Sequence, residues 1–158
     1  MFTRIVAALD GSETSEQVLE EAAELARRLG VPLHLLRVAD LTVLRVGMTE
    51  AAYAYASLGS ELAEEREKAA LYLEAVARPL RAEGLTVTTE AKSSLAASGI
   101  LAATRPGDLL AIASHGRSGP ARWLLGSVAE EVARKSAVPV LLVRAGAGGE
   151  ASGEPERD

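Results

Sequence analysis

Short apolar runs alternate with segments of helical period along this chain, and this alternation restricts the possible folds more than any other feature. The apolar runs lie at residues 5–9, 33–38, 85–91, 109–113 and 138–143. Strands that alternate with helices pair in parallel, because each helix carries the chain back over one face of the sheet. We therefore expect a doubly wound α/β domain, with helices on both faces of a five-stranded parallel sheet in the order 3-2-1-4-5.

The first helix has recognisable signals at both ends. Thr14 and Gln17 fit a capping box at its start, and Gly30 with Pro32 should close it. Apolar residues recur between these signals at the spacing of one helix face. The face that we expect to be buried carries Val18, Leu19, Ala22, Ala23, Ala26 and Leu29.

The later elements are defined by apolar spacing and by prolines. Apolar residues recur from 62 to 80 and predict a long helix, whose last turn Pro79 should kink or shorten because proline lacks an amide donor. Pro139 cannot donate to a ladder, which places the last strand at an edge of the sheet. Residues 41–60 have no clean period and fit a lid, an extra dimer contact or a mobile excursion. The last helix should bury Val128, Ala129, Val132 and Ala133.

The composition fits a single domain. The chain has 158 residues, of which 48% are apolar and 25% charged, and it contains no cysteine. We assign residues 1–145 to the domain and the polar residues 146–158 to a disordered tail. A net charge of −5 argues against broad binding to nucleic acid or anionic membranes. No run resembles a signal or a membrane-spanning segment, so we expect a cytoplasmic protein.

Two loops should meet at the carboxyl edge of this sheet, where the winding direction reverses. Asp10, Gly11 and Ser12 follow the first strand, and a loop containing Gly116 follows the fourth. The second loop leads into a helix that starts near Ser127, and the first amides of a helix have no partners within it. Because these amides and the helix dipole attract anions, we expect this loop to hold the phosphates of a nucleotide.

The second loop also carries a recognisable motif. Ala113, Gly116, Gly126 and Ser127 stand at the spacing Gly-x2-Gly-x9-Gly-[Ser/Thr], with alanine in place of the first glycine. On this motif, residues 3–144 resemble the nucleotide-binding group of the universal stress protein family, which has the adenine nucleotide alpha hydrolase-like fold. Alanine is the one departure: an extended backbone at this position tolerates its methyl group, whereas a positive φ does not.

The resemblance implies ATP or another adenine nucleotide as the ligand, with Mg²⁺ as an accompanying ion that Asp10 would hold. It also places Asp10 near the ribose and phosphates, and the backbone of Val38 beside the adenine. The residues expected to contact the nucleotide are Ala8, Asp10, Val38, Ala113, His115, Gly116, Arg117, Gly126, Ser127 and Val128.

Each of these assignments has a purely structural alternative. Gly116 fits a tight loop as well as a phosphate contact, and Gly126–Ser127 fits an ordinary helix start. Asp10 fits a turn or cap residue. His115 has no second histidine or cysteine nearby, which favours a backbone role in the loop over metal binding. Arg117 fits either phosphate neutralisation or a solvated surface.

Three functions remain open on the sequence. The first is an ATP-binding stress-response regulator, a homodimer with at most slow ATP turnover and an unidentified protein partner. The second is a nucleotide-free dimeric scaffold, which the alanine in the motif favours. The third is an ATPase or nucleotidyl-transfer enzyme, but P-loop, Gly-x-Gly-x2-Gly and nucleophile-elbow motifs are missing, so we assign no catalytic residue.

A homodimer is expected because an open apolar edge strand tends to pair with another chain. The resemblance implies the same contact. The residues of this edge are Val140, Leu141, Leu142 and Val143.

Overall fold

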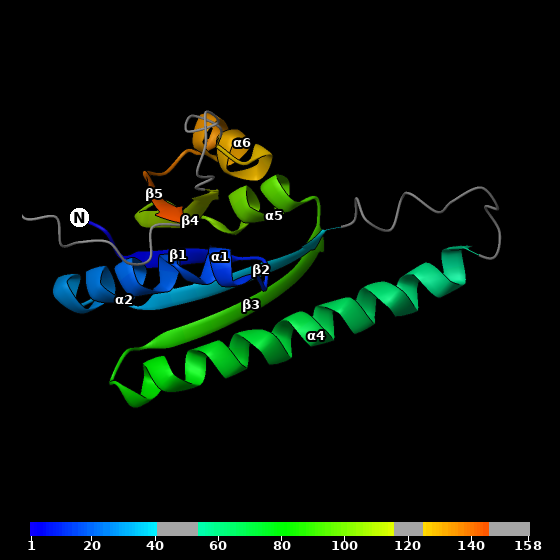
Figure 1. The fold of residues 1–158 in the computed structure, drawn as a ribbon, viewed down its shortest axis with the longest axis horizontal. Helices are drawn as coiled ribbons and strands as arrows, with labels where there is room; N and C mark the ends of the chain where they lie inside the picture. Colours follow the sequence, from blue (N-terminus) through cyan, green and yellow to red (C-terminus); the bar gives the residue numbers. More distant parts are fainter. Residues whose placement is uncertain (41–53, 116–124, 146–158) are drawn as a thin grey trace, which may run out of the picture.

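The computed structural model describes residues 1–40, 54–115 and 125–145. The elements in chain order are β1 (Arg4–Leu9), α1 (Glu13–Glu16), α2 (Val18–Leu29), β2 (Leu33–Asp40), α4 (Ala54–Ala82), β3 (Val87–Ser94), α5 (Ala96–Ala103), β4 (Asp108–His115), α6 (Ser127–Lys135) and β5 (Val140–Ala145). The strands form one parallel sheet in the order β3-β2-β1-β4-β5 (Figure 1). The predicted fold class and strand order are confirmed.

Helices cover both faces of the sheet, with α2 and α4 on one side and α5 and α6 on the other (Figure 1). Side chains of one strand alternate between these faces, which gives two apolar clusters. Ile5, Ala7 and Leu9 of β1 join the cluster under α2 and α4. Val6 and Ala8 of the same strand join the cluster under α5 and α6. Residues 5–9 are all buried, as expected for a central strand of a parallel sheet.

The start of the first helix differs from the predicted capping box. Ser12 is the N-cap, and its hydroxyl accepts a hydrogen bond from the amide of Ser15 at 3.1 Å. The prediction for Thr14 and Gln17 was wrong because the helix is interrupted: a one-turn α1 ends before Gln17, and α2 begins at the next residue.

The end of α2 agrees with the prediction, since Gly30 closes the helix with a left-handed φ of 65°. The predicted apolar face is largely buried. Its last member, Leu29, is 45% exposed because it lies in the final turn.

Helix α4 is longer than the spacing of apolar residues predicts. It begins at Ala54 and continues through Pro79 to Ala82, so the proline does not end the helix at that point.

In α6, Ala129 and Val132 are buried but Ala133 is exposed. The prediction for Ala133 was wrong: although it lies one turn after Ala129, it is in the last turn of α6, which ends at Lys135, and it is exposed.

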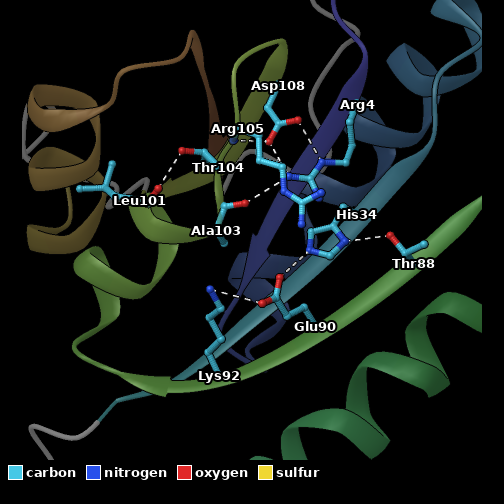
Figure 2. Close-up of polar contacts among 10 residues, drawn as sticks. All are labelled: Arg4, His34, Thr88, Glu90, Lys92, Leu101, Ala103, Thr104, Arg105 and Asp108. Atoms are coloured by element: carbon cyan, nitrogen blue, oxygen red, sulfur yellow. Dashed lines mark hydrogen bonds and ion pairs between the residues drawn. The ribbon is translucent and has the colours of Figure 1, made fainter.

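A polar cluster lies near the amino ends of the strands (Figure 2). The carboxylate of Asp108 accepts hydrogen bonds from Nε of Arg4 at 3.0 Å and from the amide of Arg105 at 2.8 Å. Burial alone raises the pKa of Asp108, but the bonds from Arg4 and Arg105 outweigh it and hold the pKa below its ordinary value. This ion pair joins β1 to β4, because Arg4 and Asp108 are register partners.

His34 lies beside this ion pair, in contact with β3 (Figure 2). Its Nδ1 is 2.8 Å from the Thr88 hydroxyl and its Nε2 is 3.1 Å from Oε2 of Glu90. Burial lowers the pKa of His34, although the bond to Glu90 opposes this. The neutral ring therefore donates from Nε2 to Glu90 and accepts from Thr88 at Nδ1.

Among the helices of the described residues, none combines the length and the apolar character needed to cross a bilayer.

Candidate functional site

A cavity of about 150 Å³ opens at the carboxyl edge of the sheet. It lies where β1 and β4 are neighbours and their following segments leave on opposite faces, which is the usual ligand position in doubly wound sheets. Its lining includes Ala8 and Asp10 from the end of β1, Val38 from β2, Ala113 from β4, and the first residues of α6. A second hollow of about 510 Å³ shares Asp10 and Val38 with it and continues toward α4.

The turn after β1 is held by its own side chains. The carboxylate of Asp10 accepts hydrogen bonds from the amide of Ser12 at 2.8 Å and from the Ser12 hydroxyl at 2.6 Å. The hydroxyl of Ser15 donates to the carbonyl of Ser12 at 2.9 Å. Gly11 lies between them with φ +89°, in the left-handed region that favours glycine. Asp10 is therefore a turn residue, and it lines the cavity as well.

The start of α6 forms another wall of the cavity. Gly126 is the N-cap residue and provides no side chain to cap the helix, so no N-cap side chain accepts a hydrogen bond from the amides of the first turn. Residues 126–129 all line the cavity. The acidic Glu130 in the first turn donates its amide back to the Gly126 carbonyl at 2.9 Å, which closes the first full helical turn.

The remaining wall is apolar. Val38, Ile100 and Ile112 line it, and they belong to or pack against the cluster under α5 and α6. Helix α5 comes close to β2 at Gly99, where a Cβ atom would lie 2.8 Å from Cγ1 of Val38. An apolar wall beside a helix start suits a ligand with an apolar ring and an anionic group.

Ala113 is compatible with a ligand at this site. It lies within β4, and no described residue other than glycine has a positive φ, so its backbone is extended. Its side chain belongs to the cluster under α2 and α4, with Leu9 and Ala145. The condition for tolerating alanine in the motif is therefore met.

Seven of the ten residues predicted to contact a nucleotide line this one cavity: Ala8, Asp10, Val38, Ala113, Gly126, Ser127 and Val128. His115 is the last residue of β4. Gly116 and Arg117 lie outside the described residues, as do the predicted tail at 146–158 and most of the segment 41–60.

Sequence reasoning missed the other seven lining residues: Leu9, Thr14, Ser15, Ala96, Ile100, Ile112 and Ala129. The positions after β1 could have been found, because a short hydroxyl-rich turn follows the strand. Nothing in the sequence alone marks Ala96 or Ile100, which reach the cavity only through the packing of α5 on β2.

The cation predicted at Asp10 stays a prediction. In the part of the chain that the structure describes, no group of three or more histidine, aspartate and glutamate side chains is gathered in a way that could hold a metal ion.

Comparisons with known proteins agree with this architecture. Universal stress protein MJ0531 from Methanocaldococcus jannaschii is 30% identical, over 91% of this chain and 83% of that protein. The structure of hypothetical protein MJ0577 superposes with a TM-score of 0.71 at 27% identity, covering 94% of this chain and 99% of that one. A universal stress protein solved in complex with cAMP has the same fold, with a TM-score of 0.58 at 21% identity over 92% of this chain and 98% of that one.

The sequence model of the universal stress protein family matches residues 1–144, which span all five strands except the last residue of β5. The chain therefore belongs to the universal stress protein family.

Proposed function

We propose that this protein binds an adenine nucleotide, ATP above all, in the cavity at the carboxyl edge of the sheet, and acts as a dimeric stress-response regulator with at most slow turnover. The observation that carries the proposal is the meeting of three features in one cavity: the first turn of α6, the Asp10 turn and the apolar wall around Val38. The cytoplasmic location and the unidentified protein partner stay predictions.

The features match the parts of a nucleotide. Amides at a helix start attract phosphate, and the wall of Val38, Ile100 and Ile112 suits the face of an adenine ring. Asp10 lines both hollows, so its carboxylate could accept a hydrogen bond from a ribose hydroxyl or bind a Mg²⁺ that accompanies the phosphates. A relative of the same fold was solved with cAMP, which is an adenine nucleotide.

The proposed dimer uses strand β5. This strand is last in the order β3-β2-β1-β4-β5, so no strand among the described residues lies beside its outer row of backbone donors and acceptors. Leu142 is 38% exposed, and its neighbours in the apolar stretch, Val140, Leu141 and Val143, are half-buried. Pairing with a second copy across a two-fold axis would satisfy the edge and bury this surface.

Calorimetric titration of nucleotide-stripped protein with Mg-ATP tests the proposal, together with mass analysis of what co-purifies. Ser127→Ala should weaken binding by about ten- to a hundred-fold, because it removes a hydrogen bond to a charged group worth about 1.5–3 kcal/mol. Ser98→Ala is the matched control, since Ser98 is exposed on α5 and does not line the cavity. Absence of Mg-ATP binding to the wild type would favour the nucleotide-free scaffold.

A sensitive phosphate-release assay tests turnover separately. Cleavage needs a positioned nucleophile and neutralisation of phosphate charge as well as a cradle. The described lining offers a cradle in the amides of α6, but its one charged side chain is the carboxylate of Asp10, which cannot neutralise phosphate charge. We expect release close to the rate in buffer, and fast release that Ser127→Ala abolishes would contradict the regulator assignment.

A further inference from the structure

Arg37 and Tyr72 support the Asp10–Ser12 turn from the sheet face that α2 and α4 cover. Arg37 is near the end of β2, on the same side of the strand as the buried Leu33 and Leu35. It pairs in register with Leu9, the last residue of β1, so its side chain starts one residue from Asp10. The guanidinium group therefore lies beside the turn, of which Asp10 lines the cavity, and Arg37 itself lines the second hollow.

The contact between Arg37 and the turn is made at Gly11. A Cβ atom on Gly11 would lie 3.0 Å from Cζ, 3.0 Å from Nη2 and 3.1 Å from Nη1 of Arg37. Three nearly equal distances mean that the glycine rests on the flat face of the guanidinium rather than on its edge. Any side chain at Gly11 would displace Arg37, in addition to the strain of a φ of +89°.

Tyr72 of α4 fixes the guanidinium in turn. Cζ of Arg37 lies 4.8 Å from the centroid of the Tyr72 ring, within the range of a cation–π contact. The Tyr72 hydroxyl donates to Oε1 of Glu16 at 2.7 Å, and Glu16 is the last residue of α1. Tyr72 of α4 therefore links Glu16, in the helix that follows the turn, to Arg37 near the end of β2.

The charges around Tyr72 fit this arrangement. Burial raises the pKa of Tyr72, the bond to Glu16 and the charges of Glu16 and Asp10 raise it further, and the positive charge of Arg37 opposes them. The tyrosine thus remains a neutral donor to Glu16 at physiological pH. A neutral ring stacks on Arg37, whose charge in turn offsets the nearby carboxylates.

We propose that Arg37 is a positioning residue for the cavity: its planar guanidinium, held on the ring of Tyr72, keeps the Asp10–Gly11–Ser12 turn in the shape that lines the site. Its predicted effect on nucleotide affinity depends on the function proposed above. Its effect on the turn does not, because the contacts exist without a ligand.

The test uses the full-length protein and two readouts. The first is hydrogen exchange by NMR of the amides of Ser12 and Ser15, whose bonds to Asp10 Oδ1 and to the Ser12 hydroxyl define the turn. The second is the dissociation constant for Mg-ATP. Arg37→Gln should speed exchange at both amides and weaken Mg-ATP binding, each roughly tenfold, a factor between those of an exposed and a desolvated cation–π contact, since Arg37 and Tyr72 are both half-buried.

Further variants separate shape from charge. Arg37→Lys keeps the charge but lacks the flat surface, so it should behave like Arg37→Gln, and Tyr72→Leu should do the same by removing the ring. Tyr72→Phe keeps the stack and should stay much closer to wild type. Arg28→Gln is the control, because Arg28 is exposed on α2 and pairs only with Glu24 among the described contacts. Urea unfolding shows whether each variant is folded.

Three outcomes would overturn the proposal. Unchanged exchange at Ser12 and Ser15 in folded Arg37→Gln would show that the turn holds its own shape. Wild-type exchange rates and Mg-ATP affinity in Arg37→Lys would show that the charge alone matters. Weaker Mg-ATP binding with unchanged exchange would make Arg37 a direct ligand contact. If the wild type does not bind Mg-ATP, the proposed function fails, and the exchange rates still decide the role of Arg37.

Discussion

Glycine-to-alanine substitution should have opposite effects in two helices of this protein. Gly59 lies in α4, and a Cβ atom there would meet nothing within 4 Å. Gly99 lies in α5, and a Cβ atom there would lie 2.8 Å from Cγ1 of Val38 and 3.0 Å from Cβ of Ser94. The chemical change is the same in both cases, and only the surroundings differ.

The magnitudes follow from two competing effects. Alanine in place of glycine inside a helix raises the free energy of unfolding by up to about 1 kcal/mol, and Gly59→Ala should gain most of this. Gly99→Ala receives the same gain, but overpacking a tight contact costs about 1–3 kcal/mol. The contact to Val38 is closer than Cβ atoms in real proteins approach their neighbours, so overpacking should win and leave a net loss of about 1 kcal/mol.

Urea unfolding followed by circular dichroism measures both changes. The midpoint should rise for Gly59→Ala and fall for Gly99→Ala, with similar slopes. Adding Val38→Ala to Gly99→Ala should recover most of the overpacking cost beyond what additivity predicts, because Val38→Ala removes the methyl groups in the way. The reasoning is refuted if Gly99→Ala stabilises the protein as much as Gly59→Ala does.

The remaining predictions concern stability, pH and assembly. Asp108→Asn leaves the guanidinium of Arg4 without its buried carboxylate and should lower the free energy of unfolding by about 3 kcal/mol. The control variant Glu131→Gln removes one partner of an exposed ion pair and should change the free energy of unfolding by less than about 0.5 kcal/mol. Because folding lowers the pKa of Asp108, its contribution is present above the ordinary pKa of 3.8 and is lost as the pH falls through the folded-state value, so the stabilities of wild type and Asp108→Asn should converge in acid. Equal sensitivity to acid would contradict this. Leu142→Lys should convert a dimer into a monomer in sedimentation velocity runs, and an unchanged sedimentation coefficient would exclude the β5 contact.

The fold was largely predictable because its signals are local and repeated. The apolar runs locate all five strands within a few residues, and the handedness of the connections restricts their order. The same topology brings Asp10 and Ser127 to one cavity, although they are far apart in the sequence. Pro139 precedes β5 directly, as its missing donor predicts.

Features that depend on register between distant segments were not predictable. The pair of Arg4 and Asp108 joins residues that are 104 positions apart, and His34 meets Glu90 only through the alignment of β2 with β3. The stack of Arg37 on Tyr72 likewise depends on how α4 packs against β2. A single sequence predicts which face of a helix or strand is buried. It does not predict the register between two such elements.

The start of the first helix shows a limit at short range. Ser12 and Thr14 both have hydroxyls suited to capping, and both are followed by polar residues three positions later. Ser12 is the cap because its hydroxyl and its amide both donate hydrogen bonds to the carboxylate of Asp10. These bonds fix the backbone before the helix begins. The choice between two adjacent caps depended on that turn rather than on the cap residues themselves.

The two edges of the sheet have unlike chemistry. Strand β3 carries Glu90 and Lys92, joined by an ion pair at 3.3 Å, whereas β5 carries a run of aliphatic side chains. A sheet with two aliphatic borders could add copies at both ends and grow into a fibre, whereas charged groups along one border oppose such growth. The charged groups on β3 thus oppose strand pairing at that edge. Association through β5 alone would stop once one partner chain is bound.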